Sequence, residues 1–339
     1  AGHVGKGNAI AFIPLVIAGI NYTLRKDKLL GALLTGIAIS FELAAGHPQI
    51  TYYLAILVMV WMITEVVMAV KDKKIVHLLV CGIYLAVAAA LGVGTNITGL
   101  ITTEEYGKYS IRGKSELTKN AQGESNASNS SSGLDKDYAL QWSNGVTEPF
   151  TLLIPNFYGG SSMGELSTSS ETYQILKQNG VPNAKQVIQS LPVYWGTQPF
   201  TAGPIYYGAI ICFLFVFGLF IIKDKAKWWI LAVSILAIFL SMGRNFMTLT
   251  DIFFYYFPLY NKFRSVTFIL SITQAVFPLL AILAVRDLFK GEIKTDELKK
   301  KLLYSLYIVG GLCFLFAAVP GIFFDFSSEA DKQLPDWIK

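Results

Sequence analysis

The chain of 339 residues is 53% hydrophobic and only 15% charged, whereas a soluble domain carries about 25% charged residues. Its formal net charge is +5, and its charges are concentrated in short runs between long apolar stretches. This composition excludes an ordinary soluble domain. The basic excess follows the pattern of a membrane topology and does not indicate nucleic-acid binding.

Eight apolar stretches are candidates to cross a bilayer, which takes roughly 20 residues of α-helix. Backbone polar groups in lipid must be hydrogen-bonded within their own segment, so we expect each stretch to be helical. The predicted spans are 8–24, 29–45, 50–70, 75–92, 205–222, 228–242, 266–285 and 302–324. The second and the sixth are short and are expected to be tilted, broken or partly buried in protein. The predicted fold class is an all-α integral membrane protein with about eight transmembrane helices and a large extracytoplasmic loop.

The basic residues predict which side of the membrane each connection occupies. Fifteen of the 28 Lys and Arg fall within 29 residues, in the connections 25–28, 71–74, 223–227 and 286–301. These connections alternate strictly along the chain, so the positive-inside rule places them in the cytoplasm. Four parts follow: helices one to four (1–92), an extracytoplasmic loop (93–204), helices five to eight with an interfacial helix near 246–257 (205–324), and an extracytoplasmic tail (325–339).

The long loop has a polar middle and ordered flanks. Residues 119–136 are rich in Ser and Asn and predict a flexible excursion. Residues 141–160 and 191–204 mix aromatic residues, Pro and Gly, which is typical of ordered, turn-rich structure. Short helices are predicted at 171–179 and 183–190. All three cysteines lie within predicted spans, so no disulfide framework is expected in the loop.

Motifs of common soluble enzymes are absent from the sequence. There is no Walker-type phosphate loop, HExxH, paired CxxC or GxSxG, and the three histidines make a multi-histidine metal centre unexpected. No cofactor is identified, although a divalent metal ion stays an open possibility. Among polar residues in the predicted spans, Glu65, His77 and Gln274 are interpreted as structural.

A first candidate binding set lies around the turn between the second and third spans. It comprises Glu42 and the following GHPQITYY stretch, with His47, Gln49, Tyr52 and Tyr53. A carboxylate at this depth is costly unless it is paired or faces water. Two interpretations stay open: a substrate-binding role for Glu42 or His47, and a helix-turn cap flanked by interfacial aromatic residues.

A second candidate set is basic and external, against the usual charge bias. It contains Arg112, Arg244 with the neighbouring Asn245, Lys262 and Arg264. Arginine matches phosphate oxygens bidentately, and a lipid phosphate would supply such a partner. The alternatives are general headgroup contacts or a surface ion pair, for example with Asp251.

Several stretches together resemble the YfhO family of bacterial multi-pass membrane proteins, most closely members from Bacteroidetes. They span nearly the whole chain in a consistent order: AGHVGK (1–6), AGHPQITYY (45–53), EYGKYSIRGKSELT (105–118), the QWSNG…EPFTLLIPNFYGG run (141–160), LPVYWGTQPFTAGPIYYGA (191–209) and YFPLYNKFRSVTF (256–268). The resemblance implies a GT-C-like glycosyltransferase of the bacterial cytoplasmic membrane. Such proteins transfer a sugar from a polyprenyl-phosphate carrier to a glycan or other cell-envelope acceptor outside the cytoplasm.

The resemblance also implies where catalysis would occur. In GT-C enzymes the catalytic acid usually lies in the first large external loop, but the first external connection here is only the GHPQ turn. We therefore expect this chain to be a fragment whose catalytic carboxylate lies upstream, and no catalytic residue is assigned. The external cations would then clamp the leaving phosphate, and Tyr194 or Trp195 would either stack on a sugar or pack within the loop. The alternatives are a flippase or transporter of a lipid-linked or polysaccharide substrate, and a non-catalytic assembly factor.

Overall fold

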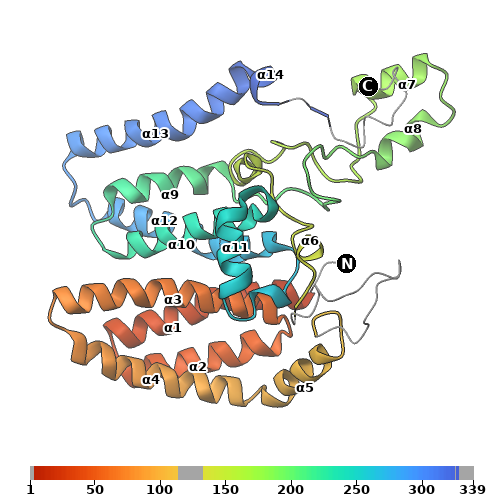
Figure 1. Ribbon diagram of the computed structural model, residues 1–339. Coiled ribbons are helices and arrows are strands. Elements are labelled where there is room, and N and C mark those ends of the chain that lie inside the picture. The colour runs from red at the N-terminus through yellow and green to blue at the C-terminus, as the bar shows by residue number, and fades with distance from the viewer. Residues whose placement is uncertain (1–3, 114–132, 325, 328–339) are drawn as a thin grey trace. The chain divides into compact units, whose positions relative to one another are not determined.

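The computed structural model describes residues 4–113, 133–324 and 326–327, and within these ranges the fold is all-α (Figure 1). Five helices are long and apolar enough to cross a membrane: Val4–Arg25, Pro48–Lys71, Ile75–Gly94, Val266–Phe289 and Thr295–Ala318. A sixth span results if the bent pair Ala226–Ser241 and Gly243–Tyr256 counts as one. The described part of the chain therefore has the architecture of an all-α membrane protein.

All eight predicted apolar stretches contain helix, but not all are long enough to span. Helix α2 (Lys28–Ala44) has 17 residues, α10 (Ala226–Ser241) has 16 and α9 (Ala209–Ile221) has 13. The start of α9 falls four residues after the predicted boundary because Gly208 adopts a φ of +105°, a backbone conformation outside the helical region. The count of eight spans stays a prediction, since length supports five or six.

The chain divides into two compact units. The first comprises residues 1–141 and 224–276, and the second comprises 142–223 and 277–339. The long loop predicted at 93–204 is thus shared between the two units and changes from one to the other after Gln141. Its middle, from 114 to 132, lies outside the described residues, as does most of the predicted tail.

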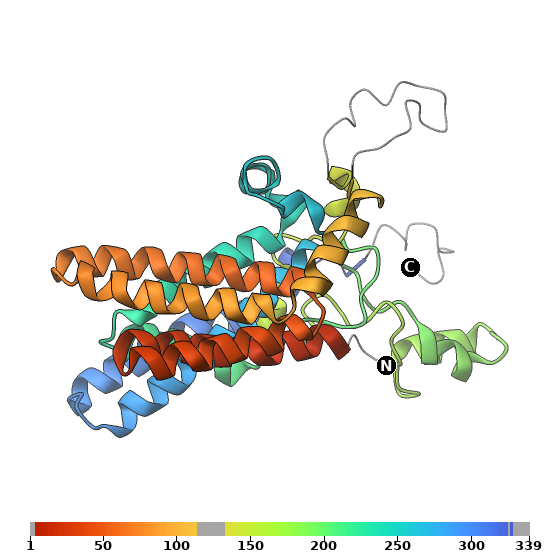
Figure 2. The same ribbon diagram turned by 90° about the horizontal axis from the view of Figure 1, so that it is seen from below.

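The first unit contains a bundle of four helices that lie side by side in both views (Figures 1 and 2). These are α1 (Val4–Arg25), α2, α3 (Pro48–Lys71) and α4 (Ile75–Gly94), and α5 (Ile97–Lys108) and α6 (Lys136–Ala139) follow. Later in the chain come α10, η4 (Gly243–Phe246), α11 (Met247–Tyr256), η5 (Tyr260–Lys262) and η6 (Val266–Ile269). The axes of α10 and of the helical stretch after it differ by 112°, and the helix predicted near 246–257 is confirmed as α11.

Two reciprocal glycine–threonine contacts hold α1 against α2. A Cβ atom on Gly31 would lie 2.3 Å from the backbone nitrogen of Thr23, and one on Gly19 would lie 2.6 Å from Oγ1 of Thr35. Each threonine hydroxyl donates to the carbonyl of the glycine four residues earlier in its own helix, at 2.9 Å for Thr23 and 2.8 Å for Thr35. The two backbones approach closely only because both glycines lack a side chain.

The second unit combines helices with turn-rich loop structure. It contains η2 (Glu148–Leu152), α7 (Glu171–Gln178), α8 (Ala184–Val187), η3 (Ile188–Ser190), α9, α12 (Leu270–Phe289) from Phe277 onward, α13 (Thr295–Ala318) and α14 (Pro320–Phe323). The short helices predicted at 171–179 and 183–190 are confirmed. They enclose a small core of Leu176, Ala184 and Ile188.

Candidate functional site

One short stretch, residues 258–268, connects most of the predicted site residues and is called the 258–268 segment. It contacts the start of α3 through two hydrogen bonds. Tyr52 donates its hydroxyl to the Pro258 carbonyl at 2.7 Å, and Gln49 donates Nε2 to the Arg264 carbonyl at 2.7 Å. Gln49 also donates to the hydroxyl of Tyr53, which is fully buried. Gln49 and Tyr53 therefore act within the protein, as supports of the 258–268 segment.

Arg112 forms a reciprocal pair of hydrogen bonds with Lys262 of the 258–268 segment. Arg112 Nε donates to the Lys262 carbonyl at 2.9 Å, and Lys262 Nζ donates to the Arg112 carbonyl at 2.6 Å. Partial burial lowers the pKa of the Lys262 ammonium. These two contacts bring together two of the predicted basic residues from distant parts of the sequence.

Arg264 and Arg244 meet the short stretch 138–140 at the end of α6. Arg264 Nη1 donates to the Tyr138 hydroxyl at 2.5 Å, and its guanidinium carbon lies 5.7 Å from the centre of that ring. Arg244 Nε donates to the Leu140 carbonyl at 3.0 Å, and between them the Ser265 amide donates to the Ala139 carbonyl at 3.1 Å. The two arginines therefore bind residues that are only two positions apart in the chain, Tyr138 and Leu140.

The remaining predicted residues of the turn have clear local roles. Glu42 is buried, with 1% of its surface exposed, and both its carboxylate oxygens accept the Thr51 hydroxyl, at 2.8 and 3.0 Å. This contact closes the turn before α3 and favours the cap interpretation for Glu42. His47 precedes Pro48 as the N-cap residue of α3, and its ring lies edge-on to Phe268, with centroids 6.1 Å apart. Asn245 is exposed beside Arg244 in η4.

The anticipated ion pair with Asp251 involves a residue outside the predicted set. Lys136 of α6 contacts Asp251 at 2.5 Å and lies 4.9 Å from the centre of the Tyr255 ring. The hydrogen bonds described above for Arg112, Arg244, Lys262 and Arg264 are instead with neutral carbonyl and hydroxyl oxygens.

The 258–268 segment also contains two strained residues. Leu259 and Ser265 have φ values of +65° and +60°, in the left-handed region that non-glycine residues rarely adopt. Such conformations cost about 1–3 kcal/mol each and persist where surrounding contacts hold them, often at binding sites. Ser265 is held by its amide contact to Ala139, directly after Arg264.

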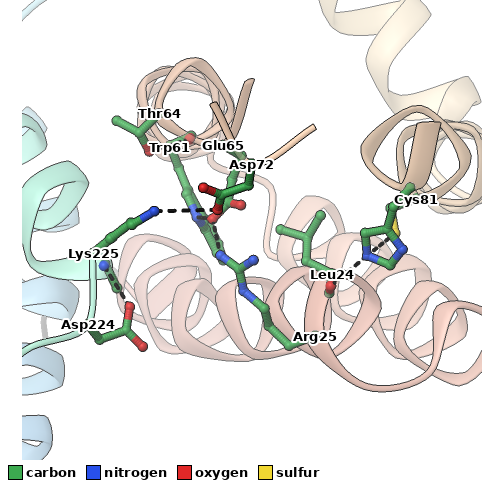
Figure 3. A network of polar contacts seen from close by, with 11 residues as sticks. Leu24, Arg25, Trp61, Thr64, Glu65, Asp72, Cys81, Asp224 and Lys225 are labelled. Carbon is green, nitrogen blue, oxygen red and sulfur yellow. Dashed lines mark hydrogen bonds and ion pairs between the residues drawn. The ribbon is translucent and has the colours of Figure 1, made fainter. Parts of the chain in front are cut away.

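A second polar network lies near the opposite end of the bundle (Figure 3). Arg25 of α1 contacts Glu65 of α3 at 2.5 Å, and Trp61 donates its indole nitrogen to the same carboxylate oxygen at 3.1 Å. Lys225 and Asp72 form a more exposed pair at 3.4 Å. His77 contacts the Leu24 carbonyl at 3.0 Å and the Cys81 sulfur at 3.5 Å. These contacts tie helices together, which agrees with the structural interpretation of Glu65 and His77.

The second unit holds a buried carboxylate that the sequence did not reveal. Glu148 is 4% exposed and accepts hydrogen bonds from the Gly145 amide (2.7 Å), the Tyr194 hydroxyl (2.8 Å) and Gln198 Nε2 (2.8 Å). It thereby joins the two loop flanks, 141–160 and 191–204. Tyr194 is thus engaged within the loop, and Trp195 packs on Tyr158 with ring centroids 4.4 Å apart, which favours loop packing over sugar stacking.

Glu148 is expected to make the loop sensitive to pH. Burial raises the pKa of this carboxyl above its ordinary value, against the opposing effect of its three hydrogen bonds. The folded loop therefore favours the protonated form, so its stability is fully present below the unfolded pKa, near 4.3, and declines as pH rises through the folded pKa. Proteolysis within residues 141–204 should be faster at pH 8 than at pH 5, after correction for protease activity.

Two variants test this assignment. Glu148→Gln cannot titrate and is expected to remove the pH dependence, while Glu165→Gln, at an exposed glutamate of the same loop, should keep it. If both variants behave like the wild type, another group controls the loop.

The described residues contain no group of three or more His, Cys, Asp or Glu that could hold a metal ion. The fold and contacts define an all-α membrane protein with a basic site assembled around one interhelical segment. Comparison with protein-family models, curated proteins and solved structures gave no match. The resemblance to the YfhO family, with the fold and activity that it implies, stays a prediction.

Proposed function

We propose that this chain is part of a GT-C-like glycosyltransferase of the bacterial cytoplasmic membrane, with about eight spans and the 258–268 segment outside the cytoplasm. It would transfer a sugar from a polyprenyl-phosphate carrier to an envelope acceptor. The observation that carries the proposal is the gathering of Arg112, Lys262 and Arg264 on one short segment, with Arg244 joined to it through residues 138–140. Cations so placed suit the phosphate of a lipid carrier.

An arginine at such a site can bind a protein carbonyl and a phosphate at the same time. A guanidinium has five N–H donors, and the contact of Arg112 with the Lys262 carbonyl uses only Nε. Sugar transfer breaks the bond between the anomeric carbon and a phosphate oxygen, which leaves additional negative charge on the phosphate. Fixed cations stabilise that charge more in the transition state than in the ground state, and this lowers the barrier.

The proposal is tested with the full-length protein in membranes and a radiolabelled polyprenyl-phosphate sugar. Arg264→Ala and Arg112→Ala should each reduce transfer roughly 10- to 100-fold, the loss expected for a hydrogen bond between charged groups. Lys185→Ala, at an exposed basic residue of α8, serves as the control and should leave the rate unchanged. Transfer that survives both arginine substitutions unchanged overturns the phosphate clamp.

One observation favours a different function, that of a non-catalytic assembly factor. The carboxylate of Glu42 is committed to Thr51 in the turn, and no other acid of the predicted set lies among the site residues. Absence of sugar transfer by the full-length wild type, together with retained binding of polyprenyl phosphate, would support this alternative. Movement of the lipid-linked sugar across the membrane without transfer would instead indicate a flippase.

A further inference from the structure

An apolar groove runs between α2 and α4, within the first unit and away from the basic site. Its cavity volume is about 550 Å³, and it is lined by α2 between Leu29 and Phe41 and by α4 and the residue after it, from Ile83 to Thr95. Its rims are large exposed side chains at helical spacing, such as Leu33 on α2 (53% exposed) and Val87 on α4 (55% exposed). The groove is called the α2–α4 groove below.

Small residues form the floor of this groove because the two helices touch there. A Cβ atom on Gly36 would lie 3.0 Å from the Ala88 carbonyl oxygen, and one on Gly92 would lie 2.7 Å from that of Gly36. The two helices therefore leave no gap at the floor of the groove, and the open space lies above the floor, between the two rims. Helix α4 is itself a candidate span, so the groove opens at the depth of the lipid chains.

The lining of the groove indicates what fills it. Its walls are apolar side chains and helix backbone, with Ser40 and Thr95 as polar residues at one end. Lipid tails are as apolar as leucine side chains, and a flexible hydrocarbon chain can follow a groove between two rims.

A small cluster of polar side chains lies at the end of the groove near Gly94, and most of its hydrogen-bond donors are already used. Thr95 donates its hydroxyl to the Gly92 carbonyl at 2.8 Å, so the hydroxyl of Ser40, 2.7 Å away, must donate to Thr95. The Asn96 amide nitrogen donates to the Ser40 carbonyl at 3.0 Å and to Thr95 Oγ1 at 3.0 Å. The hydrogen-bonding capacity left for a ligand is then acceptor oxygen, on the Ser40 hydroxyl and the Asn96 amide.

We propose that the α2–α4 groove binds one acyl chain of a membrane phospholipid whose head group carries hydrogen-bond donors, such as phosphatidylethanolamine. The chain lies between the rims, and the ammonium group of the head donates to the acceptor oxygens at the Ser40 end. This site is separate from the basic site, and it does not depend on sugar transfer.

The test uses the protein in nanodiscs with phosphatidylethanolamine or phosphatidylcholine of identical chains, each carrying a photoactivatable diazirine in one acyl chain. Crosslinked residues are then mapped by mass spectrometry. The ethanolamine lipid should label 29–41 and 83–95 about five-fold more than the choline lipid, which lacks an N–H donor, as expected for one hydrogen bond. Ser40→Ala removes one of the two acceptor oxygens and should weaken this preference while the chain still labels the groove.

Filling the groove provides the second measurement. Leu33→Trp and Val87→Trp should each remove most labelling of the groove, because the indole occupies the space between the rims. Ile63→Trp is the matched control, since Ile63 is 56% exposed on α3 and does not line the groove. All three positions are exposed, and gel filtration verifies that each variant keeps the wild-type elution volume.

Three results would overturn the inference. Labelling spread evenly over the apolar faces of α2 and α4 would mean that no chain is bound in the groove. Equal labelling by the two head groups would remove the role of the Ser40 end. Labelling only by a diazirine-bearing polyprenyl phosphate would show that the occupant is not a phospholipid.

Discussion

Gly31→Ala should strongly destabilise the first unit, because the added methyl group has no space. A Cβ at this position lies 2.3 Å from the Thr23 backbone nitrogen and 2.6 Å from the Thr23 Cα atom. Backbone atoms of a packed helix cannot rotate away as a side chain can, so α1 and α2 would have to separate. Overpacking commonly costs about 1–3 kcal/mol, and we expect the upper end of that range.

Thermal unfolding of the purified protein in detergent, followed by tryptophan fluorescence, measures this effect. Gly82→Ala in α4 is the control, since a Cβ there meets no atom within 4 Å. Alanine favours a helix over glycine by about 1 kcal/mol, so this variant should unfold at the same temperature as the wild type or higher. Equal unfolding temperatures for Gly31→Ala and Gly82→Ala would show that the hairpin tolerates separation.

The local elements were predictable because they depend on short patterns. Apolar stretches of helical length, the Gly and Pro positions that interrupt them, and the two short loop helices all follow from neighbouring residues. The tight α1–α2 crossing was not predicted, although each glycine precedes a threonine by four residues in both helices. That spacing is visible in the sequence, but its meaning depends on which helix packs against which.

The arrangement of the candidate site was even less predictable from local sequence patterns. The external basic residues could be selected by their charge against the positive-inside bias, yet their arrangement depends on contacts across 150 and 215 residues of sequence, as in Arg112–Lys262 and Gln49–Arg264. No local pattern encodes such pairings. Tyr138 and Lys136, which contact Arg264 and Asp251, were missed for this reason. Lys136 is the last residue of the stretch 119–136 predicted to be flexible, but it begins α6, and Tyr138 lies two residues after it.

Arg25→Leu is the second substitution with a large expected effect, because it leaves a buried carboxylate without its cation. The Glu65 side chain is 6% exposed and the Arg25 side chain is 50% exposed. Removing the arginine strands the charge on the buried partner, with Trp61 as its remaining donor among the described contacts. Breaking a buried pair in this way costs about 3–5 kcal/mol.

The double variant Arg25→Leu/Glu65→Leu separates the cost of an unpaired buried carboxylate from the loss of the attraction between the two side chains. Replacing a buried ion pair with two apolar residues often changes stability little, so the double variant should recover most of the unfolding temperature that Arg25→Leu loses.

Lys225→Leu is the control in the same region (Figure 3), because its pair with Asp72 is 3.4 Å long and about half exposed on both sides. Pairs of that kind contribute about 0–1 kcal/mol. The half-exposed arginine can reach other partners, but the buried glutamate cannot. Glu65→Leu should therefore lower the unfolding temperature less than Arg25→Leu. The reverse order would mean that Glu65 is solvated in the membrane-bound protein.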